Sequence, residues 1–198
     1  GCPFGCSYCL SSIDKTVRFR PMDMVKEELA FFLDKKVKQV KFIDRTFNCN
    51  RARALEIWNF LREKDNGITN FHFEIAADLL GEEEIACLKS MRPGQVQLEI
   101  GVQTTNPETL REIHRTMDME KLRRNVALLR EANNIHLHLD LIAGLPYEDM
   151  ESFIRSFCEV YSWGGNNLQL GFLKVLHGSL MEENAEAYGL LYEKSAPY

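Results

Sequence analysis

Apolar residues recur along the chain at two different spacings, and these predict helices and strands in alternation. An apolar residue at every third or fourth position is typical of a helix that buries one face. Short runs rich in Val, Ile, Leu and Phe, bounded by polar turns, are typical of strands. The predicted helices cover residues 21–36, 51–62, 82–91, 106–133 with a break near 117–118, and 149–163; the predicted strands cover 37–44, 71–77, 96–104, 135–143 and 168–176, and a weakly helical tail covers 179–189.

The connections between these elements favour a parallel sheet. Asn106-Pro107 offers a capping side chain followed by proline at the first helical position, and Asp118 can cap the second part of the same region. Gly164-Gly165 ends the last long helix before the final strand. Strand and helix alternate five times along the chain, which is the order produced by parallel strands with helical crossovers.

Successive side chains of a strand point to opposite faces of the sheet, so each predicted strand divides into two sets of residues. In three of the strands one set is apolar and the other is largely polar. The apolar set suits packing against helices, whereas the polar set has to line a space that is wet or holds a polar ligand, because burying unpaired carboxylates is costly. The polar sets are His72, Glu74, Ala76 and Asp78; Gln97, Glu99, Gly101 and Gln103; and His136, His138, Asp140 and Ile142.

Two architectures can present such a polar face. One is a curved, incomplete barrel with a polar interior, and the other is a one-sided sheet whose polar face is exposed. Helix-connected parallel sheets are usually covered on both faces, and one-sided sheets are more often antiparallel. The pattern therefore favours an α/β fold of the incomplete-barrel type.

Composition narrows the class of protein. The chain has 198 residues, of which 45% are hydrophobic and 27% charged, as in a soluble globular domain. Its net charge of −5 is spread along the sequence and gives no basic face, so nucleic-acid binding is not expected of this segment. No apolar run approaches the roughly 18 residues of a membrane span, and no stretch of the chain has the pattern of a signal peptide. The six cysteines then indicate a reducing compartment, expected to be the cytoplasm, and ligand chemistry in place of disulfides.

Three of these cysteines lie at the start of the chain with the spacing Cys2-x3-Cys6-x2-Cys9. A closed zinc site needs four protein ligands, usually as two short pairs. Three thiolates on one loop suit an iron–sulfur cluster in which one iron has no protein ligand and is free to bind something else. A zinc site completed from elsewhere, or three reduced core thiols, are the alternatives that spacing alone leaves open.

The remaining candidates have less specific patterns. Cys87 and Cys158 fall on or beside apolar helix faces and are expected to be core thiols, and Cys49 is expected not to be a ligand. His138 is either a substrate contact or a hydrogen-bonded structural histidine. Glu99, one inward position before Gly101, is expected to face the substrate region.

Several motifs in this order resemble the radical S-adenosylmethionine (radical SAM) superfamily. The resemblance covers essentially the whole chain. It is nearest to the branch that contains oxygen-independent coproporphyrinogen oxidase, the methylthiotransferases and the cobalamin-binding radical enzymes. The motifs are the cysteine loop with Tyr8 inside it, Gly101-Val102-Gln103-Thr104, Asp140-Leu141-Ile142-Ala143-Gly144-Leu145-Pro146, and Leu173-Lys174-Val175-Leu176-His177-Gly178-Ser179.

What the resemblance implies is a partial (β/α)6 TIM-like barrel of parallel strands whose first strand is largely missing. Residues 1–198 would form one radical SAM core domain excised from a longer protein. Cys2, Cys6 and Cys9 would hold a 4Fe-4S cluster, and its unique iron would chelate the amino and carboxylate groups of S-adenosyl-L-methionine. The reduced cluster would cleave that molecule to a 5′-deoxyadenosyl radical, which abstracts a hydrogen atom from the substrate.

Several residues match cofactor contacts of the coproporphyrinogen-oxidase branch. Glu74, Gln103 and Asp140 match the polar groups that bind the ribose hydroxyls, and all three belong to the polar face described above. Arg115 matches the arginine that pairs with the methionine carboxylate, where a planar guanidinium suits two oxygens. A solvated helix arginine is the alternative for Arg115.

Other positions match less closely or depart from the family pattern. Tyr8 and Ile142 would flank the adenine. Relatives often carry Gly-Gly-Glu after the second strand to hold the methionine amino group, whereas this chain has a turn that begins at Asp44 and continues Arg-Thr-Phe-Asn. Asp44 or backbone carbonyls would have to accept from the ammonium. His177 replaces a common proline and could be a plain surface residue.

The resemblance also bears on partners. It implies an external one-electron donor of the flavodoxin or ferredoxin type and, in cobalamin-type relatives, a cobalamin bound by an upstream domain. Flanking regions set the substrate in this family, so the substrate is not defined here, and an isolated core segment could fold without being active. The alternative from a different functional class is a non-catalytic barrel that binds zinc or a nucleotide.

Overall fold

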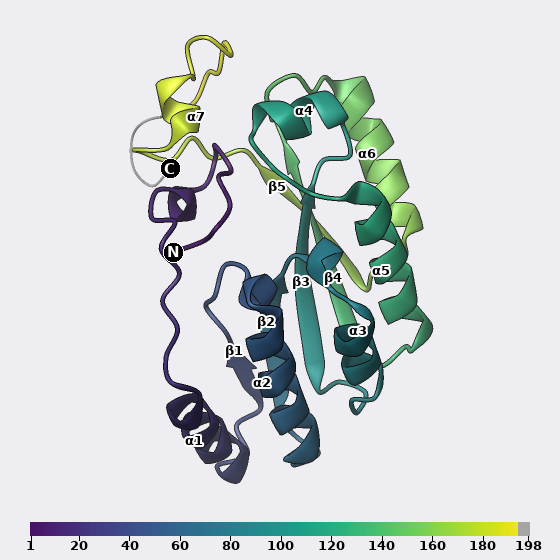
Figure 1. Cartoon of the computed structure of the whole chain (residues 1–198). Helices are drawn as coiled ribbons and strands as arrows, with labels where there is room; N and C mark the ends of the chain where they lie inside the picture. Colours follow the sequence, from purple (N-terminus) through teal and green to yellow (C-terminus); the bar gives the residue numbers. More distant parts are fainter. Residues whose placement is uncertain (194–198) are drawn as a thin grey trace.

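The computed structural model describes residues 1–193 and shows five parallel strands in one sheet, connected by helices (Figure 1). The strands follow one another across the sheet in chain order, so every connection joins neighbouring strands. The predicted α/β alternation is therefore confirmed, and the expected domain limit of residue 198 lies outside the described residues. The strands are β1 (Gln39–Lys41), β2 (Asn70–Ile75), β3 (Val96–Gln103), β4 (His136–Ala143) and β5 (Asn167–Phe172).

The helices begin and end close to the predicted positions. The predicted break near 117–118 separates α4 from α5, and Asp118 caps α5 by accepting a hydrogen bond from the Lys121 amide at 3.0 Å. No helix among residues 1–193 is both long and apolar enough to cross a membrane. The helices are α1 (Met22–Asp34), α2 (Arg51–Glu63), α3 (Glu82–Lys89), α4 (Pro107–Glu112), α5 (Met119–Glu131), α6 (Met150–Ser162) and α7 (Leu180–Glu183), with 3-10 turns η1 (Leu10–Ser12), η2 (Phe47–Cys49) and η3 (Ala77–Leu79).

Three elements are shorter than predicted. Strands β1 and β5 are the edges of the described sheet, where a strand has a neighbour on one side only. Strand β5 ends at Phe172 because its partner Ala143 is the last residue of β4 and Gly144 then turns with φ +89°. Strand β1 departs from β2 after Lys41, and the predicted helical tail 179–189 contains only the short α7.

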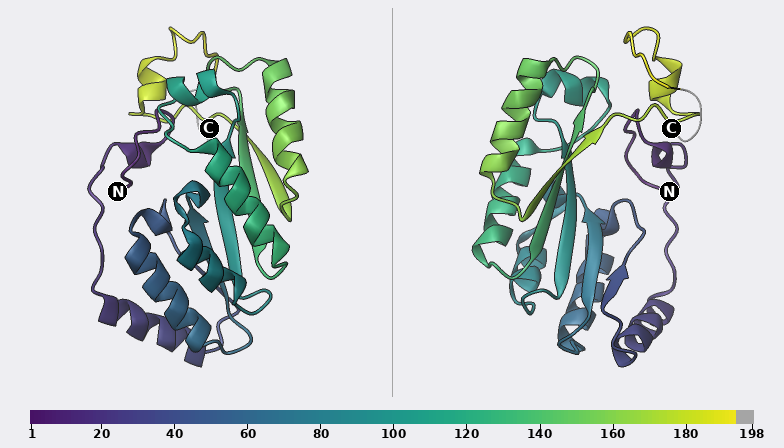
Figure 2. Two further views of the ribbon diagram at one scale, coloured as in Figure 1. Left: turned by 45° about the vertical axis from the view of Figure 1, so that its right-hand side comes forward. Right: turned by 180° about the vertical axis from the view of Figure 1, so that it is seen from behind.

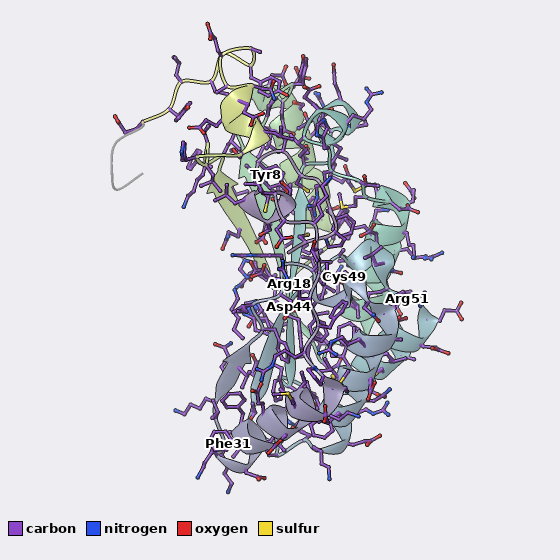
Figure 3. All side chains as sticks on the ribbon, turned by 60° about the vertical axis from the view of Figure 1, so that its left-hand side comes forward. Tyr8, Arg18, Phe31, Asp44, Cys49 and Arg51 are labelled. Carbon is purple, nitrogen blue, oxygen red and sulfur yellow. The ribbon has the colours of Figure 1, made fainter. Side chains whose placement is uncertain are left out.

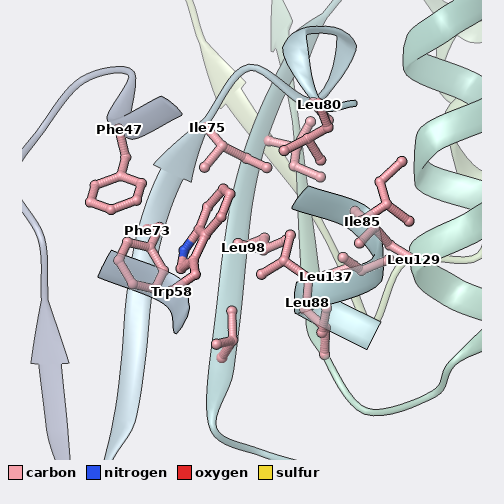
Figure 4. Close-up of a cluster of buried hydrophobic side chains, with 14 of the residues drawn as sticks. Phe47, Trp58, Phe73, Ile75, Leu80, Ile85, Leu88, Leu98, Leu129 and Leu137 are labelled. Carbon is pink, nitrogen blue, oxygen red and sulfur yellow. The ribbon is translucent and has the colours of Figure 1, made fainter. Parts of the chain in front are cut away.

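The two faces of the central strands differ as expected. The aliphatic residues of β3 are at most 1% exposed and pack against the helices, which gather on one side of the sheet (Figure 2). Figure 4 shows this core between the strands and α2, α3 and α5, with Trp58 of α2 fully buried beside Phe73 of β2. Burial of the apolar face on this scale is the main stabilising contribution to the fold.

The cysteine loop is anchored by two segments that are distant in sequence. The Ser7 amide donates to the Ile113 carbonyl at 2.9 Å, just after α4, and the Met181 amide of α7 donates to the Ser7 carbonyl at 2.9 Å. Figure 1 accordingly shows the N-terminal loop beside α7. These bonds hold the loop over the carboxyl ends of the strands, where parallel α/β proteins carry their binding sites.

Candidate cofactor-binding site

A cavity of about 220 Å³ brings the three N-terminal cysteines together with the polar face of the sheet. Eight of the ten predicted site residues line it, whereas Asp44 and Ile142 do not. Residues from six separate parts of the chain therefore meet in one place. The lining is Cys2, Phe4, Cys6, Tyr8, Cys9, Arg45, Thr46, Glu74, Ile75, Ala76, Asp78, Glu99, Gly101, Gln103, Arg115, Thr116, Met117 and Asp140.

The cysteines differ in their surroundings. Cys6 is buried at 7% exposure, and Cys2 and Cys9 are half-buried. The Cys2 sulfur lies 3.6 Å from the Thr46 hydroxyl. In residues 1–193 no three His, Cys, Asp or Glu side chains are grouped as ligands of a single metal ion. A cluster with several iron atoms does not require its thiolates to converge on one point, and three soft sulfur donors around one cavity have the chemistry that such a cluster needs.

Arg115 connects the cysteine loop to strand β3. Its Nη1 donates to the Tyr8 hydroxyl at 3.2 Å and approaches the Cys6 sulfur at 3.7 Å, while Nη2 donates to the Gly101 carbonyl. Burial by itself would lower the pKa of Arg115, but the adjoining Tyr8 and Cys6 raise it above its ordinary value. Its Nε is buried and has no hydrogen-bond partner among the described residues. The alternative of a solvated helix arginine is thus not what the structure shows.

Tyr8 belongs both to this cavity and to a small apolar cluster. Burial raises the pKa of its hydroxyl, although the Arg115 charge acts in the opposite direction. The cluster has Ile113, Leu145 and Met181 at its centre, with Tyr8 and Ile142 packed against it. Ile142 therefore lies beside Tyr8, as the adenine-flanking prediction requires, but outside the cavity lining.

Gln103 stands at an irregular strand end. Its backbone has φ +72°, in the left-handed region that non-glycine residues rarely adopt, and the pairing of β3 with β4 shifts register between Gly101 and Gln103. The carboxamide oxygen Oε1 is buried without a partner within residues 1–193. A Cβ on Gly101 would lie 2.3 Å from Gln103 Nε2, so a larger residue at position 101 would force the end of the Gln103 side chain to move.

The floor of the cavity carries an excess of carboxylates. Burial, together with the negative charges of Glu99 and Glu74, raises the pKa of Asp140 to about 7. Asp140 Oδ1 lies 3.2 Å from His138 Nε2. At this floor a proton can therefore be held or released near neutral pH.

Two cations and a histidine balance the glutamates. Lys41 Nζ lies 3.2 Å from Glu99 Oε2 and 3.5 Å from Glu74 Oε1, and Arg45 Nη1 lies 3.7 Å from Glu74 Oε2. His72 Nε2 is 2.8 Å from Glu99 Oε2, while burial and the Lys41 charge lower the pKa of His72. Glu99 is thus occupied by protein partners on the side away from the cavity.

Asp44 was expected near the methionine amino group, but it lines a neighbouring cavity of about 610 Å³. The next two residues of the same turn, Arg45 and Thr46, line the cavity that contains the cysteines. Figure 3 shows Asp44 and Cys49 on this side of the molecule, below Tyr8. Thr46 was missed because a lone threonine has no motif. Its position in a turn that follows a strand, at the same edge as the cysteine loop, is the signal that could have identified it.

The other cysteines and His177 give a mixed result. Cys87 is buried, as predicted, and Cys49 is half-buried, with a pKa raised by burial and by the neighbouring Cys2 and Asp44. The prediction for Cys158 is wrong, because α6 buries Ser152, Ser156 and Val160 and leaves Cys158 exposed. His177 is 98% exposed and lies 3.0 Å from Glu182 Oε2.

Comparisons with known proteins agree with this arrangement. The model of the radical SAM superfamily matches residues 1–157. An uncharacterized methyltransferase of Pyrococcus horikoshii is 28% identical over 157 residues, which are 76% of this chain and 33% of that protein. Oxygen-independent coproporphyrinogen III oxidase of Salmonella typhimurium is 32% identical over 139 residues, 65% of this chain and 28% of the enzyme. The chain thus spans about a third of the length of these relatives.

Among solved structures, the radical SAM methyltransferase TsrM from Kitasatospora setae, which contains cobalamin and a [4Fe-4S] cluster, has a TM-score of 0.81 with this chain. The sequences are 20% identical, and the match covers 94% of this chain and 35% of TsrM. At this identity the likeness concerns the fold. It places the five-stranded sheet within the partial TIM-like barrel of such proteins.

Proposed function

The chain belongs to the radical SAM superfamily, and on this premise we propose that it is a catalytic core in which Cys2, Cys6 and Cys9 hold a 4Fe-4S cluster. The family uses such a cluster with S-adenosyl-L-methionine, and together they supply a 5′-deoxyadenosyl radical that abstracts hydrogen from a substrate. One observation carries the assignment to these residues. The three thiols share one cavity with the polar groups Glu74, Gln103, Arg115 and Asp140.

The protein groups around the cavity have distinct tasks in this proposal. Glu74, Gln103 and Asp140 bind the ribose hydroxyls, and the unpaired Oε1 of Gln103 is an acceptor that such a hydroxyl would satisfy. Arg115 supplies a fixed positive charge for a carboxylate, since its guanidinium is held between Tyr8 and the Gly101 carbonyl. A donor or acceptor that is already in position costs little reorganisation when the ligand binds.

The apolar cluster next to the cavity excludes water from one side of it. Ile113, Leu145 and Met181 are at most 3% exposed, and Tyr8 and Ile142 pack on them. We propose that Tyr8 and Ile142 form the surface against which the adenine lies. Asp44 has no role in this proposal, because it faces the neighbouring cavity.

The proposal extends to partners only in general terms. Cluster chemistry of this kind consumes one electron, so an external one-electron donor of the flavodoxin or ferredoxin type is required, and a reducing cytoplasm is the compartment that suits it. No described residue is assigned to cobalamin, which is bound in TsrM. Glu99 lines the same cavity, and we propose that it faces the substrate region.

The test is reconstitution of the protein with iron and sulfide in the absence of oxygen. Four iron and four sulfide per chain are expected, and reduction with dithionite in the presence of S-adenosylmethionine should release 5′-deoxyadenosine, measured by chromatography. Cys6→Ala should abolish this product. Cys158→Ala, which changes an exposed cysteine of α6 away from the cavity, is the matched control and should retain it.

Two outcomes would contradict the proposal. One is 5′-deoxyadenosine formation by Cys6→Ala at the rate of the unmodified protein. The other is one zinc and no sulfide in protein purified without oxygen, which would favour the non-catalytic metal-binding barrel instead.

A further inference from the structure

A buried polar network lies directly behind the cavity, outside its lining. It joins Thr104, the residue after Gln103, to Glu148 in the loop after β4 and to Ser156 in α6. Thr104 and Ser156 are 0% and 1% exposed. The three side chains come from two different strand–helix units, and buried polar groups in such a position need an explanation because they are costly unless they are paired.

The bonds of this network converge on the chain immediately after Gln103. The Thr104 hydroxyl donates to Glu148 Oε1 at 2.5 Å and accepts from the Asn106 amide at 3.0 Å. The Ser156 hydroxyl donates to the same carboxylate oxygen at 3.3 Å and accepts from the Thr105 amide at 3.1 Å. The Ser156 hydroxyl of α6 and the Thr104 hydroxyl thus pair with the backbone amides of residues 105 and 106, which lie beyond the end of β3.

A second contact connects the same two loops. Asn106 caps α4 by accepting from the Glu108 amide at 3.0 Å, and its Nδ2 donates to the Tyr147 carbonyl at 3.1 Å. Tyr147 also has a positive φ of +59°. The chain therefore has a positive φ both at the end of β3, at Gln103, and in the loop after β4, at Tyr147. The Asn106–Tyr147 hydrogen bond joins the two loops.

This arrangement explains how Gln103 keeps a conformation that it would not adopt by itself. A non-glycine residue in the left-handed region persists only where its surroundings over-determine it. Gln103 combines this positive φ with a side chain that lines the cavity, and its Oε1 is buried without a partner within the described residues. If the following residues were released, Gln103 would relax toward a negative φ and its side chain would leave the cavity.

We propose that Thr104, Glu148 and Ser156 are positioning residues that clamp Gln103 in the conformation that binds the ribose of S-adenosylmethionine. This inference rests on the proposed function, because it assigns a role in binding the same cofactor. The three residues touch neither the cavity nor the cofactor. They act through the backbone of residues 103–106.

Burial raises the pKa of Glu148, whereas its bonds with Thr104 and Ser156 act in the opposite direction. Its second oxygen, Oε2, is buried with no partner in residues 1–193. A neutral glutamine can accept the same two hydroxyl bonds through its carbonyl oxygen. Glu148→Gln is therefore the conservative variant, and it should preserve the clamp, whereas Glu148→Ala removes the acceptor.

The test compares Thr104→Val, Ser156→Ala, Glu148→Ala and Glu148→Gln in the reconstituted protein. Calorimetry should show S-adenosylmethionine bound about ten-fold more weakly by the first three variants, the effect of losing one well-placed hydrogen bond. Their KM should rise with little change in kcat for 5′-deoxyadenosine, and Glu148→Gln should stay near the unmodified protein. Amide exchange at residues 103–106 of the cofactor-free protein should be about ten-fold faster in the same three variants, since the clamp acts before the ligand binds.

The matched control is Asn134→Ala. Asn134 is also buried and donates to the Leu88 and Met91 carbonyls at 3.0 and 2.8 Å, at the opposite ends of the strands. It should lower the melting temperature as the network variants do, but leave the affinity for S-adenosylmethionine unchanged.

The clamp is wrong if Ser156→Ala and Glu148→Ala lower the melting temperature while affinity, KM and exchange at residues 103–106 all stay within two-fold of the unmodified protein. If Thr104→Val does not fold, Ser156→Ala decides the question, because it removes one hydroxyl and adds no volume. Failure of the unmodified protein to bind S-adenosylmethionine would instead overturn the proposed function, and the exchange measurement would still decide whether the clamp exists.

Discussion

The two faces of strand β3 differ in burial and in residue type: one is buried and apolar, and the other is half-buried and mostly polar. On the outer face, Val96, Leu98, Ile100 and Val102 are almost completely buried and belong to the apolar core. On the inner face every residue from Gln97 to Gln103 is only partly buried and polar or glycine. The outer residues tolerate replacement by others of similar volume, whereas Glu99 and Gly101 on the inner face have specific partners.

This difference separates stability from function within eight residues. The outer face contributes free energy through area removed from water, which depends little on direction. The inner face contributes positions and charges, which depend on single atoms, as the contacts of Glu99 and Gln103 illustrate. Substitutions on the two faces should therefore be distinguishable by what they change.

The largest effect is expected on the outer face. Leu98→Ala should lower the free energy of unfolding by about 2–5 kcal/mol, because it leaves a cavity in a fully buried core. Denaturant unfolding measures this, with Gln97→Ala on the other face as the control, expected within about 0.5 kcal/mol of the unmodified protein. Equal losses for the two variants would show that the faces are not divided in this way.

A pH-dependent effect of intermediate size is expected at Asp140. Its pKa is about 7 in the folded state and has the ordinary value near 4 in the unfolded chain, so between these values the folded protein binds more protons. The contribution of Asp140 to stability is therefore complete below pH 4 and is lost as the pH rises through 7.

Asp140→Asn should remove this dependence. The difference in unfolding free energy between the unmodified protein and the variant should change by on the order of 2–3 kcal/mol from pH 4 to pH 7.5. Unfolding curves of the cofactor-free proteins at several pH values measure it. A difference that stays constant over this range would mean that Asp140 titrates normally and that the carboxylates at the cavity floor do not interact.

The smallest effect is expected at Lys41, which is about half exposed and pairs with Glu74 and Glu99. Lys41→Gln should cost about 0.2–1 kcal/mol, as for other exposed ion pairs. It should also raise the pKa of Asp140, because the positive charge of Lys41 lowers it. An NMR titration of Asp140 detects this change; Lys89→Gln, which breaks the outer pair with Glu131, should not produce it.

Much of the fold could be predicted because it depends on local patterns. Alternation within residues 96–104 and 135–143 assigned both faces of β3 and β4 correctly. Strand ends were predicted wrongly where the pairing with a neighbouring strand sets them. The edge strand β1 was predicted over 37–44, but its pairing with β2 ends at Lys41. Cys158 was misplaced because apolar spacing on α6 does not reveal that Ser152 and Ser156 face the core.

The candidate site divides in the same manner. Eight of the ten predicted site residues line the cavity. Cysteine spacing and the polar face account for six of them, because motif and strand period are properties of the sequence, and the family resemblance added Tyr8 and Arg115. Asp44 was predicted to line the cavity and does not, whereas Thr46, which was not predicted, does. The direction of a turn depends on φ and ψ values that the residue types of that turn do not determine.

The sequence by itself determined the family, the alternation of parallel strands and helices, and which face of each strand is polar, since all three follow from residue type and period. Only the tertiary structure decided that Arg115 contacts both Cys6 and Tyr8, that Asp140 shares its charge environment with Glu74 and Glu99, and that Thr104 is tied to Glu148 and Ser156. The physical reason is range. Propensity and periodicity act over a few residues, whereas the hydrogen bonds among these contacts join residues between 44 and 109 positions apart once packing has fixed the backbone.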